Sequence, residues 1–241
     1  MGDFMDSTAL WSGGVRLIPA ADVFPLGTDA VLLASFAGTS GVRKMLDLGC
    51  GSGVISLLLA LRCPQASGRG VDILPAAVEN ARQNAACNGL ADRLSFETGD
   101  LRNFRMMDGA GAYDLVTANP PYFPVGSGFS AAGAAADARQ EHTCTLAQIC
   151  AAAGYFTRWG GRFAMVHRPE RLAEIVRAAA AAGLEPKRLR FVQARPDAAP
   201  SLLLMEARRG AKPGLTVEPP LILTNPDGSD TEELKQIYHR T

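Results

Sequence analysis

The sequence predicts an α/β fold: a doubly wound, mostly parallel sheet of seven strands in which the last strand is antiparallel. Short apolar runs alternate with helix-like stretches of about ten residues or more, which is typical of βαβ crossovers. Runs such as Leu46–Leu48 are continuously apolar, and this favours strands that are covered on both faces. The last two strands are joined only by Arg195–Pro200, so we expect them to pair antiparallel.

The expected elements follow one another along the chain. Strands are expected at Arg43–Leu48, Arg69–Ile73, Leu94–Thr98, Tyr113–Ala118, Gly161–His167, Leu189–Ala194 and Ser201–Ala207. Helices are expected at Gly53–Arg62, Pro75–Cys87, Leu146–Trp159 and Glu170–Ala182. Phe123–His142 shows no clear period, and a loop of this length is usually functional or disordered. Gly210–Gly228 is rich in Pro and Gly and is expected to be irregular, whereas acidic residues in a first turn indicate a short helix at Thr231–Tyr238.

Composition bounds the class of protein. The chain has 241 residues, of which 47% are hydrophobic, and we expect a single domain with an N-terminal extension (1–25), a core (26–209) and a C-terminal tail (210–241). It offers no membrane span and no secretory signal. Five cysteines without CxxC spacing indicate reduced thiols in a cytoplasmic protein and no metal site. The sequence does not predict the oligomeric state.

Charge is unevenly distributed. Lys+Arg and Asp+Glu both number 24, so the formal net charge is zero and a basic coat over the whole protein is excluded. Residues 138–212, however, hold 13 basic and 6 acidic residues, a net charge of +7, and 11 of the basic residues are arginine. Arginine suits phosphate better than lysine does, so this segment predicts a phosphate-binding face; ordinary solvated helices and strands are the alternative.

A glycine-rich turn, Asp47-Leu-Gly49-Cys-Gly51-Ser-Gly53, leads from the first expected strand into a helix. Gly49, Gly51 and Gly53 allow a sharp turn and a close approach of the backbone to a ligand. Pyrophosphate binders carry G-x-G-x-x-G at this place, whereas this chain has G-x-G-x-G with Asp47 just before it. Asp47 would repel pyrophosphate but could hold an ammonium group through water, which suits an amino acid joined to a nucleoside.

Carboxylates follow the next two strands. Asp72 ends the second strand, where it can accept both ribose hydroxyls of a nucleoside, with Ile73 packed on one face of the base. Asp100 follows the third strand and can accept from an adenine amino group, with Leu101 beside the ring. Taken alone, Asp100 would instead cap a helix.

The fourth strand is followed by Asn119-Pro120-Pro121-Tyr122. The ends of the first and fourth strands flank the switch point of a doubly wound sheet, where ligands bind. Two prolines remove two donors, so the Asn119 side-chain oxygen and the Pro120 carbonyl remain as acceptors. Two acceptors beside the aromatic face of Tyr122 suit a planar NH2 group, because they can hold its hydrogens and stabilise positive charge that develops on nitrogen.

These residues, in this order and spacing, resemble the class I S-adenosylmethionine-dependent methyltransferases that methylate amines. The resemblance implies S-adenosylmethionine as cofactor, direct in-line methyl transfer and no metal. Leu26–Leu33 resembles the segment that holds the methionine end of the cofactor, which implies roles for Thr28 and Asp29. His142, His167 and His239 lie outside the motifs and are expected to be structural or at the surface.

A narrower resemblance spans nearly the whole chain. The absence of a large recognition domain, the segment Arg168-Pro-Glu-Arg171-Leu and the segment Pro186-Lys187-Arg188 resemble bacterial enzymes that methylate N6 of adenosine 37 in a valine tRNA. This implies tRNA as partner. We expect several basic side chains to form a phosphate-binding rim around the site: Arg139, Arg168, Arg171, Lys187, Arg188, Arg190 and Arg195.

Other functions remain open at this point. A glutamine methyltransferase acting on release factors uses the same Asn-Pro-Pro-Tyr chemistry but carries an N-terminal helical domain, whereas 25 residues precede Leu26 here. A DNA adenine methyltransferase is a second alternative, but such an enzyme requires a target-recognition domain. Methylation of guanine N2 in ribosomal RNA is a third alternative. A non-catalytic cofactor-binding or RNA-binding module is disfavoured by the intact Asn119–Tyr122.

Overall fold

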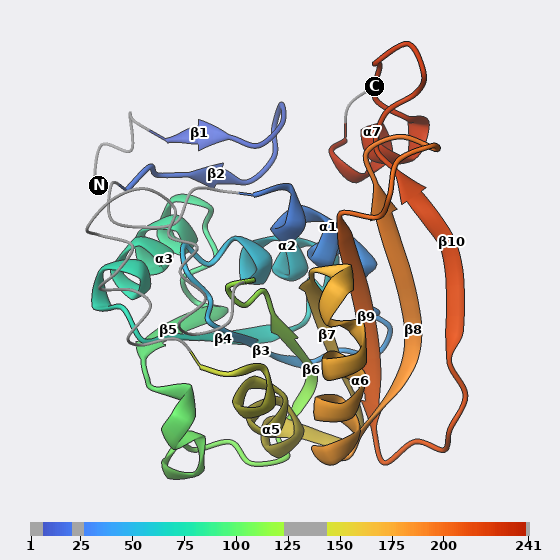
Figure 1. The fold of residues 1–241 in the computed structure, drawn as a ribbon. Helices are drawn as coiled ribbons and strands as arrows, with labels where there is room; N and C mark the ends of the chain where they lie inside the picture. Colours follow the sequence, from blue (N-terminus) through green and yellow to red (C-terminus); the bar gives the residue numbers. More distant parts are fainter. Residues whose placement is uncertain (1–6, 21–26, 123–143, 240–241) are drawn as a thin grey trace, which may run out of the picture.

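The computed structural model describes residues 7–20, 27–122 and 144–239, and its central sheet runs through the whole molecule (Figure 1). The sheet contains β3 (Lys44–Leu48), β4 (Ser67–Asp72), β5 (Leu94–Thr98), β6 (Tyr113–Ala118), β7 (Thr157–His167), β8 (Leu184–Gln193), β9 (Leu202–Arg209) and β10 (Thr216–Ile222). The spatial order is β10-β8-β9-β7-β6-β3-β4-β5. Neighbouring strands are parallel except at β9, which is antiparallel to both β7 and β8. The predicted α/β class, the mostly parallel sheet and the antiparallel hairpin are therefore confirmed.

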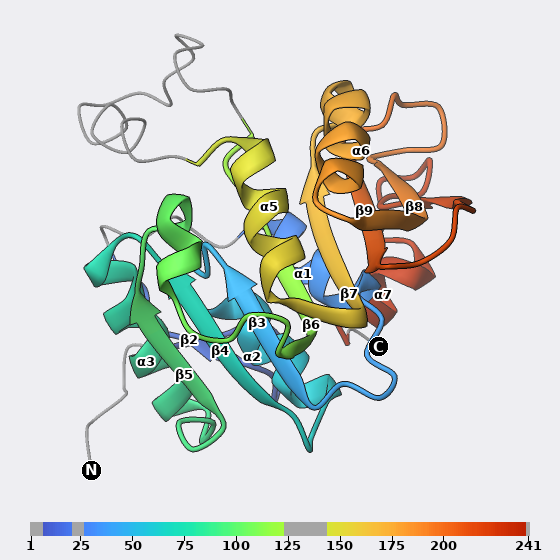
Figure 2. The same cartoon turned by 90° about the horizontal axis from the view of Figure 1, so that it is seen from below.

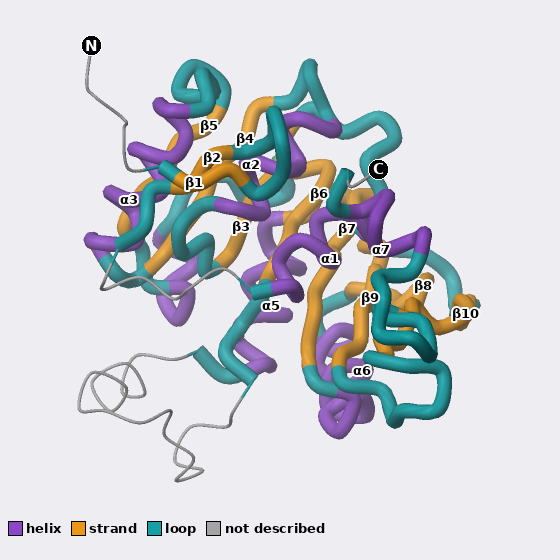
Figure 3. Tube along the Cα trace, turned by 90° about the horizontal axis from the view of Figure 1, so that it is seen from above, coloured by secondary structure: helices purple, strands orange, loops and turns teal. Residues whose placement is uncertain are grey.

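Helices cover both faces of this sheet. One face carries α1 (Thr28–Phe36), α2 (Val54–Arg62), α3 (Pro75–Cys87) and α7 (Glu232–Ile237), and the other carries α5 (Leu146–Phe156) and α6 (Leu172–Ala181) (Figures 2 and 3). The short 3-10 helices η1 (Leu101–Met106) and η2 (Pro169–Arg171) follow β5 and β7. Along β3, Met45 packs in the α1–α3 cluster, while Leu46 and Leu48 pack in the α5–α6 cluster. This alternation is what a strand buried on both faces requires.

The prediction of seven strands was wrong by one, because Thr216–Ile222 in the supposedly irregular tail forms β10. It pairs parallel with β8 at the edge of the sheet. Pro219 and Pro220 made this segment look irregular, but the pairing register shifts between Glu218 and Leu221, where the prolines lie. An edge strand tolerates proline at such a bulge, since its outward N–H groups need no partner strand.

One predicted helix ends earlier in the structure, and one helix was not predicted. The helix expected to reach Trp159 ends at Phe156, because Thr157 Oγ1 donates to the Ala153 carbonyl at 2.7 Å and Thr157 pairs with Tyr113 in the sheet. The helix α1 was not predicted as a helix. Ala30–Ala34 are all buried, so this helix is apolar all round and lacks the polar face that marks a surface helix.

A small hairpin, β1 (Thr8–Ala9) and β2 (Arg16–Leu17), lies over α3 (Figure 3). Asparagine side chains of α3 and its C-cap hold it. Asn80 Nδ2 donates to the Ile18 carbonyl at 3.0 Å, and the Ile18 N–H donates to Asn84 Oδ1 at 2.8 Å. Asn88 exchanges two bonds with the backbone of Arg16. The hairpin is thus attached to the helix that supports the glycine loop.

The topology places the motif-bearing strand ends together. β3 lies between β4 and β6, and all three are parallel, so the loops after their carboxyl ends meet at one edge of the sheet. In the described part of the chain, no helix combines the length and apolar character needed to cross a bilayer. The same residues contain no group of three or more His, Cys, Asp or Glu side chains suited to a metal ion.

Candidate active site

The loop after β3 has a conformation that requires glycine at three positions. Gly49, Gly51 and Gly53 have φ values of 71°, 51° and 78°, in the left-handed region that strains other residues. A Cβ on Gly49 or Gly51 would meet nothing within 4 Å, whereas one on Gly53 would press on Ala81 and Phe96 at 3.0 Å. Gly53 therefore serves packing, while Gly49 and Gly51 leave open space next to the backbone.

Asp47 lies buried beneath this loop. Its Oδ1 accepts from Thr117 Oγ1 at 2.8 Å and its Oδ2 from Ser56 Oγ at 3.2 Å. Burial raises the pKa of Asp47 to about 6, with the charge of Asp72 adding to the rise and the two hydroxyls opposing it. The carboxyl of Asp47 thus links β3 to β6 and α2 by hydrogen bonds next to the glycine loop.

Asp72 ends β4 beside the same loop. Its Oδ2 accepts from the Gly51 N–H at 2.8 Å, and its Oδ1 accepts from the Leu74 N–H at 3.0 Å. The carboxylate therefore fixes the middle of the glycine loop and the turn that leads into α3. The half-buried Ile73 follows it directly, as the sequence order requires.

Asp100 starts η1, where it acts as the helix cap that the sequence offered as an alternative. Its carboxylate accepts from the Arg102 backbone N–H at 2.9 Å and pairs with the Arg102 guanidinium at 2.7 Å. Leu101 is buried. The expected contact of Asp100 with an adenine amino group stays a prediction.

The motif Asn119–Tyr122 leaves β6 at the same edge, next to the glycine loop. Pro120 is buried and Pro121 is exposed, while Asn119 and Tyr122 are half-buried. The Tyr122 hydroxyl donates to Asp29 Oδ2 and lies 3.3 Å from Asn119 Oδ1. Burial, together with the Asp29 carboxylate, raises the pKa of Tyr122, so its hydroxyl remains a donor.

Residues from the end of β7 close on the Tyr122 ring. The His167 ring centroid lies 5.4 Å from it with the planes at 63°, and the Arg168 guanidinium carbon lies 5.4 Å from the Tyr122 centroid. Burial and the nearby Arg171 lower the pKa of His167 to about 4, so the imidazole is neutral at pH 7. The sequence had pointed to no role for His167. Its position at the carboxyl end of the strand next to β6 was the signal that could have found it.

Thr28 and Asp29 begin α1, and their side chains differ in exposure. Thr28 is exposed, whereas Asp29 is half-buried and uses both carboxylate oxygens. Its Oδ1 accepts from the Ala30 N–H at 2.8 Å, and its Oδ2 accepts from Tyr122. The structure therefore brings Asp29 to the Asn119–Tyr122 motif, a contact that the sequence did not predict.

The expected basic rim is only partly assembled. Arg168 follows β7 at the carboxyl edge and donates to the Ser201 carbonyl at 3.2 Å. Arg171 lies nearby but is ion-paired with Glu174 at 2.5 Å. Arg139 falls outside the described residues. Lys187 donates to the Lys212 carbonyl at 3.2 Å, toward the start of β8.

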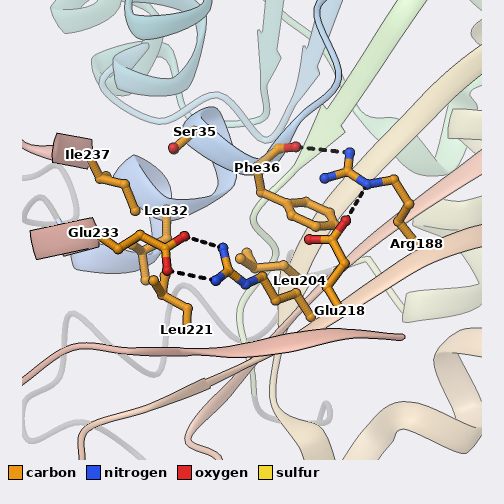
Figure 4. A pocket seen from close by; sticks show the side chains of 10 residues that line it. Leu32, Ser35, Phe36, Arg188, Leu204, Glu218, Leu221, Glu233 and Ile237 are labelled. Carbon is orange, nitrogen blue, oxygen red and sulfur yellow. Dashed lines mark hydrogen bonds and ion pairs between the residues drawn. The ribbon is translucent and has the colours of Figure 1, made fainter. Parts of the chain in front are cut away.

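Arg188, which was also expected at this rim, is ion-paired with Glu206 and Glu218. It pairs in the sheet with Glu206, which in turn pairs with Ala164 of β7. Figure 4 shows its guanidinium over Phe36 and against Glu218, in a pocket between α1, β8, β10 and α7. Arg190 in the same pocket pairs with Glu233 at 2.6 Å. Sequence could not reveal these pairings, because each partner comes from a distant element.

The chain is similar in sequence to known methyltransferases. A family described as a methyltransferase domain matches residues 40–182. A curated relative from Porphyromonas gingivalis strain W83, named tRNA1(Val) (adenine(37)-N6)-methyltransferase, is 35% identical over 189 residues, which cover 76% of this chain and 74% of the relative. A relative of the same name from Phocaeicola vulgatus is 43% identical over 98 residues, or 41% of this chain and 40% of the relative.

Solved structures share the fold. A predicted O-methyltransferase from Agrobacterium tumefaciens superposes with a TM-score of 0.71 at 22% identity, covering 89% of this chain and 97% of that one. A geranyl diphosphate methyltransferase in complex with S-adenosylmethionine gives a TM-score of 0.56 at 18% identity, covering 75% and 84% of the two chains. At these identities the similarity establishes the architecture, not the substrate.

Proposed function

The chain belongs to the methyltransferase family, and from this premise we propose that it transfers a methyl group from S-adenosylmethionine to N6 of an adenosine in tRNA. The observation that carries the proposal is the position of Asn119–Tyr122 at the carboxyl end of β6, beside the glycine loop after β3. This is the switch point of the sheet, and ligands of doubly wound α/β sheets bind at such a point.

The residues around the glycine loop fit S-adenosylmethionine. The open space over Gly49 and Gly51 admits a ligand close to the backbone, and Asp72 stands beside it at the end of β4. We propose that Asp72 takes the ribose hydroxyls, that Ile73, Asp100 and Leu101 surround the adenine, and that Asp47 attracts the amino group of the methionine end. When bound, S-adenosylmethionine supplies an electrophilic methyl group on its sulfonium.

The chain's own residues would prepare the nucleophile. The lone pair of an exocyclic amine is delocalised into the ring, so the amine must be held and its charge stabilised as it reacts. The Asn119 side-chain oxygen and the Pro120 carbonyl are acceptors for its two N–H bonds, and Tyr122 offers a face on which the base stacks. The amine nitrogen forms the new C–N bond as the C–S bond breaks, and the surplus proton leaves to water.

We propose tRNA as the substrate, at adenosine 37 of a valine tRNA. Support comes from the relatives that carry this activity in their names and from Arg168 at the edge of the site. An anticodon-loop base is already unpaired, so placing it against Tyr122 costs less than extruding a base from a duplex. We infer that the enzyme works in the cytoplasm, where tRNA is modified.

The test is methylation of a panel of substrates. The protein is incubated with S-adenosylmethionine and, separately, with tRNA from cells lacking the modification, ribosomal RNA, duplex DNA and a release factor. We expect N6-methyladenosine only in the digested tRNA. Product only in one of the other three substrates would contradict the proposed substrate. No product on any of them, with the cofactor still bound, would contradict the proposed activity.

A further inference from the structure

We propose that Asp29 is a positioning residue for Tyr122: its carboxylate holds the tyrosine hydroxyl, so that the ring faces the substrate base and Asn119 stays free for the amine. This inference rests on the proposed function, because it assigns Asn119 and Tyr122 to the substrate. It differs from the role in cofactor binding that the sequence resemblance implies for Asp29.

The first support is the occupation of both Asp29 oxygens by donors of the chain itself. Oδ2 accepts from the Tyr122 hydroxyl, which lies 93 residues further along the sequence, and Oδ1 accepts from the Ala30 N–H at 2.8 Å. The carboxylate therefore bridges the first turn of α1 and the loop after β6. A group that held only the cofactor would not need the Tyr122 contact.

The second support is the space around the carboxylate. A Cβ built on Gly27 would fall 2.2 Å from Asp29 Oδ1, so the absence of a side chain at this position lets the carboxylate lie where it does. Gly27 has a φ of −97°, which any residue can adopt. An alanine there would displace the carboxylate without straining the backbone or removing its charge.

The third support is the way in which the Tyr122 ring is held at its other surfaces. His167 packs edge-on at 5.4 Å and is buried, with 1% of its surface exposed, while the Arg168 guanidinium lies 5.4 Å from the ring centroid. His167 Nδ1 accepts from the Arg168 N–H at 2.7 Å, which fixes the imidazole. The ring is thus clamped by the end of β7, and its hydroxyl end is held by α1.

Asp29 and Asn119 are alternative acceptors for the Tyr122 hydroxyl, and this explains why the contact between Asp29 and Tyr122 matters for catalysis. The Tyr122 oxygen lies 3.3 Å from Asn119 Oδ1, the atom proposed to accept from the substrate amine. With Asp29 present, the carboxylate is the stronger acceptor and receives the hydrogen bond of the hydroxyl. Without it, Asn119 becomes the nearest remaining acceptor of the hydroxyl, and the tyrosine competes with the substrate for that oxygen.

A double-mutant cycle tests the proposal. The variants are Asp29→Ala, Tyr122→Phe and the two combined, with Asp29→Asn as the conservative variant that keeps an acceptor oxygen. We expect Asp29→Ala to lower the single-turnover rate at saturating S-adenosylmethionine by about a hundredfold, as a misplaced reacting group does. Asp29→Asn should recover part of the rate. In the Tyr122→Phe background, Asp29→Ala should cause no further loss.

The affinity for S-adenosylmethionine, measured by calorimetry, separates the two roles of Asp29. We expect this affinity to stay within about threefold of the parent in all the Asp29 variants, because it is the orientation of Tyr122 that changes. Gly27→Ala should reproduce the rate loss. Asp108→Asn, which removes an exposed carboxylate elsewhere, is the charge-matched control. A large loss of cofactor affinity with an unchanged saturated rate, or rate losses that multiply in the double variant, would overturn the proposal.

A structural readout distinguishes failure of this proposal from failure of the proposed function. If the parent protein methylates no RNA, the cycle is repeated on the free energy of unfolding in denaturant. Non-additive effects of Asp29→Ala and Tyr122→Phe on unfolding would support the contact even then. Additive effects would overturn it, whatever the substrate proves to be.

Discussion

At the residue scale, the buried carboxyl of Asp47 makes a prediction about pH. Its pKa rises from 3.8 to about 6 on folding, because burial disfavours the charged form. The folded state therefore binds this proton more tightly than the unfolded state does. The resulting stabilisation is fully present below about pH 4 and is lost as the pH rises through about 6.

Asp47→Asn isolates this effect, since the amide has nearly the same shape and does not titrate. Without cofactor, the stability of the parent relative to Asp47→Asn should fall by up to about 3 kcal/mol between pH 4 and pH 7, at 1.36 kcal/mol per pKa unit. Denaturant unfolding of both proteins across this range measures it. A difference that does not change with pH would contradict the raised pKa.

Asn119 carries the second prediction at this scale. Asn119→Ala should lower methylation by about a hundredfold or more, as loss of one preorganised hydrogen-bonding group in an active site does. Binding of S-adenosylmethionine should survive, because Gly49, Gly51 and Asp72 remain. Asn103→Ala, at an exposed position of η1, is the matched control. Activity of Asn119→Ala within about tenfold of the parent would refute the role of the acceptor pair.

At the element scale, α3 connects the N-terminal hairpin with the glycine loop. Asn84 is fully buried, and its Nδ2 donates to the Ser52 carbonyl at 2.9 Å while its Oδ1 accepts from the Ile18 N–H at 2.8 Å. The side chain of Asn88, one turn later, is hydrogen-bonded to the backbone of Arg16 in the hairpin and, among the described residues, to no other segment outside α3. The two asparagines therefore share the hairpin but differ in their contact with the loop.

This difference predicts different effects of two matched substitutions. Asn84→Ala should cost about 3 kcal/mol of unfolding free energy, because it leaves buried polar groups unpaired, and should weaken S-adenosylmethionine binding. Asn88→Ala should cost about 1 kcal/mol and leave cofactor binding unchanged. Denaturant unfolding and calorimetry measure the two effects. Equal loss of cofactor affinity in both variants would show that the hairpin, and not the Ser52 contact, is responsible.

The features that could be predicted are those whose signal lies in residues close together in the sequence. The glycine loop, Asp72 and Asn119–Tyr122 were placed correctly at one edge of the sheet, because each directly follows a recognisable strand. The strand β10 was missed, because its tolerance of proline depends on its lying at the edge. The contact between Asp29 and Tyr122 was missed as well, because nothing local relates residues so far apart in the sequence.

The charge pattern was the least reliable guide. The excess of arginine in residues 138–212 predicted a phosphate-binding rim, but Arg188 and Arg190 are ion-paired to carboxylates of β10 and α7. A count of charges along the sequence cannot distinguish a cation that is paired across the fold from one that faces a ligand. Among the described residues expected at the rim, Arg168 packs over Tyr122.

At the scale of the whole molecule, we expect the affinity for RNA to fall with rising salt, because cations at the carboxyl edge of the sheet contact phosphates. Arg168→Ala should weaken tRNA binding and lower the slope of log affinity against log salt by about 0.7 to 0.9, the value for one lost phosphate contact. Arg171→Ala should change the slope less, since Glu174 already pairs with it. Arg43→Ala, at the opposite edge, should leave the slope unchanged. An unchanged slope in Arg168→Ala would remove Arg168 from the interface.

The central claim is that this fold presents a tRNA adenine to the acceptors after β6. The most direct measurement compares two transcripts of a valine tRNA, one with adenosine at position 37 and one with guanosine there, each incubated with S-adenosylmethionine. Mass spectrometry of the digested RNA then reports methylated nucleosides. We predict N6-methyladenosine from the first transcript and none from the second, with the signal lost in Asn119→Ala. Equal methylation of both transcripts, or of neither, would contradict the claim.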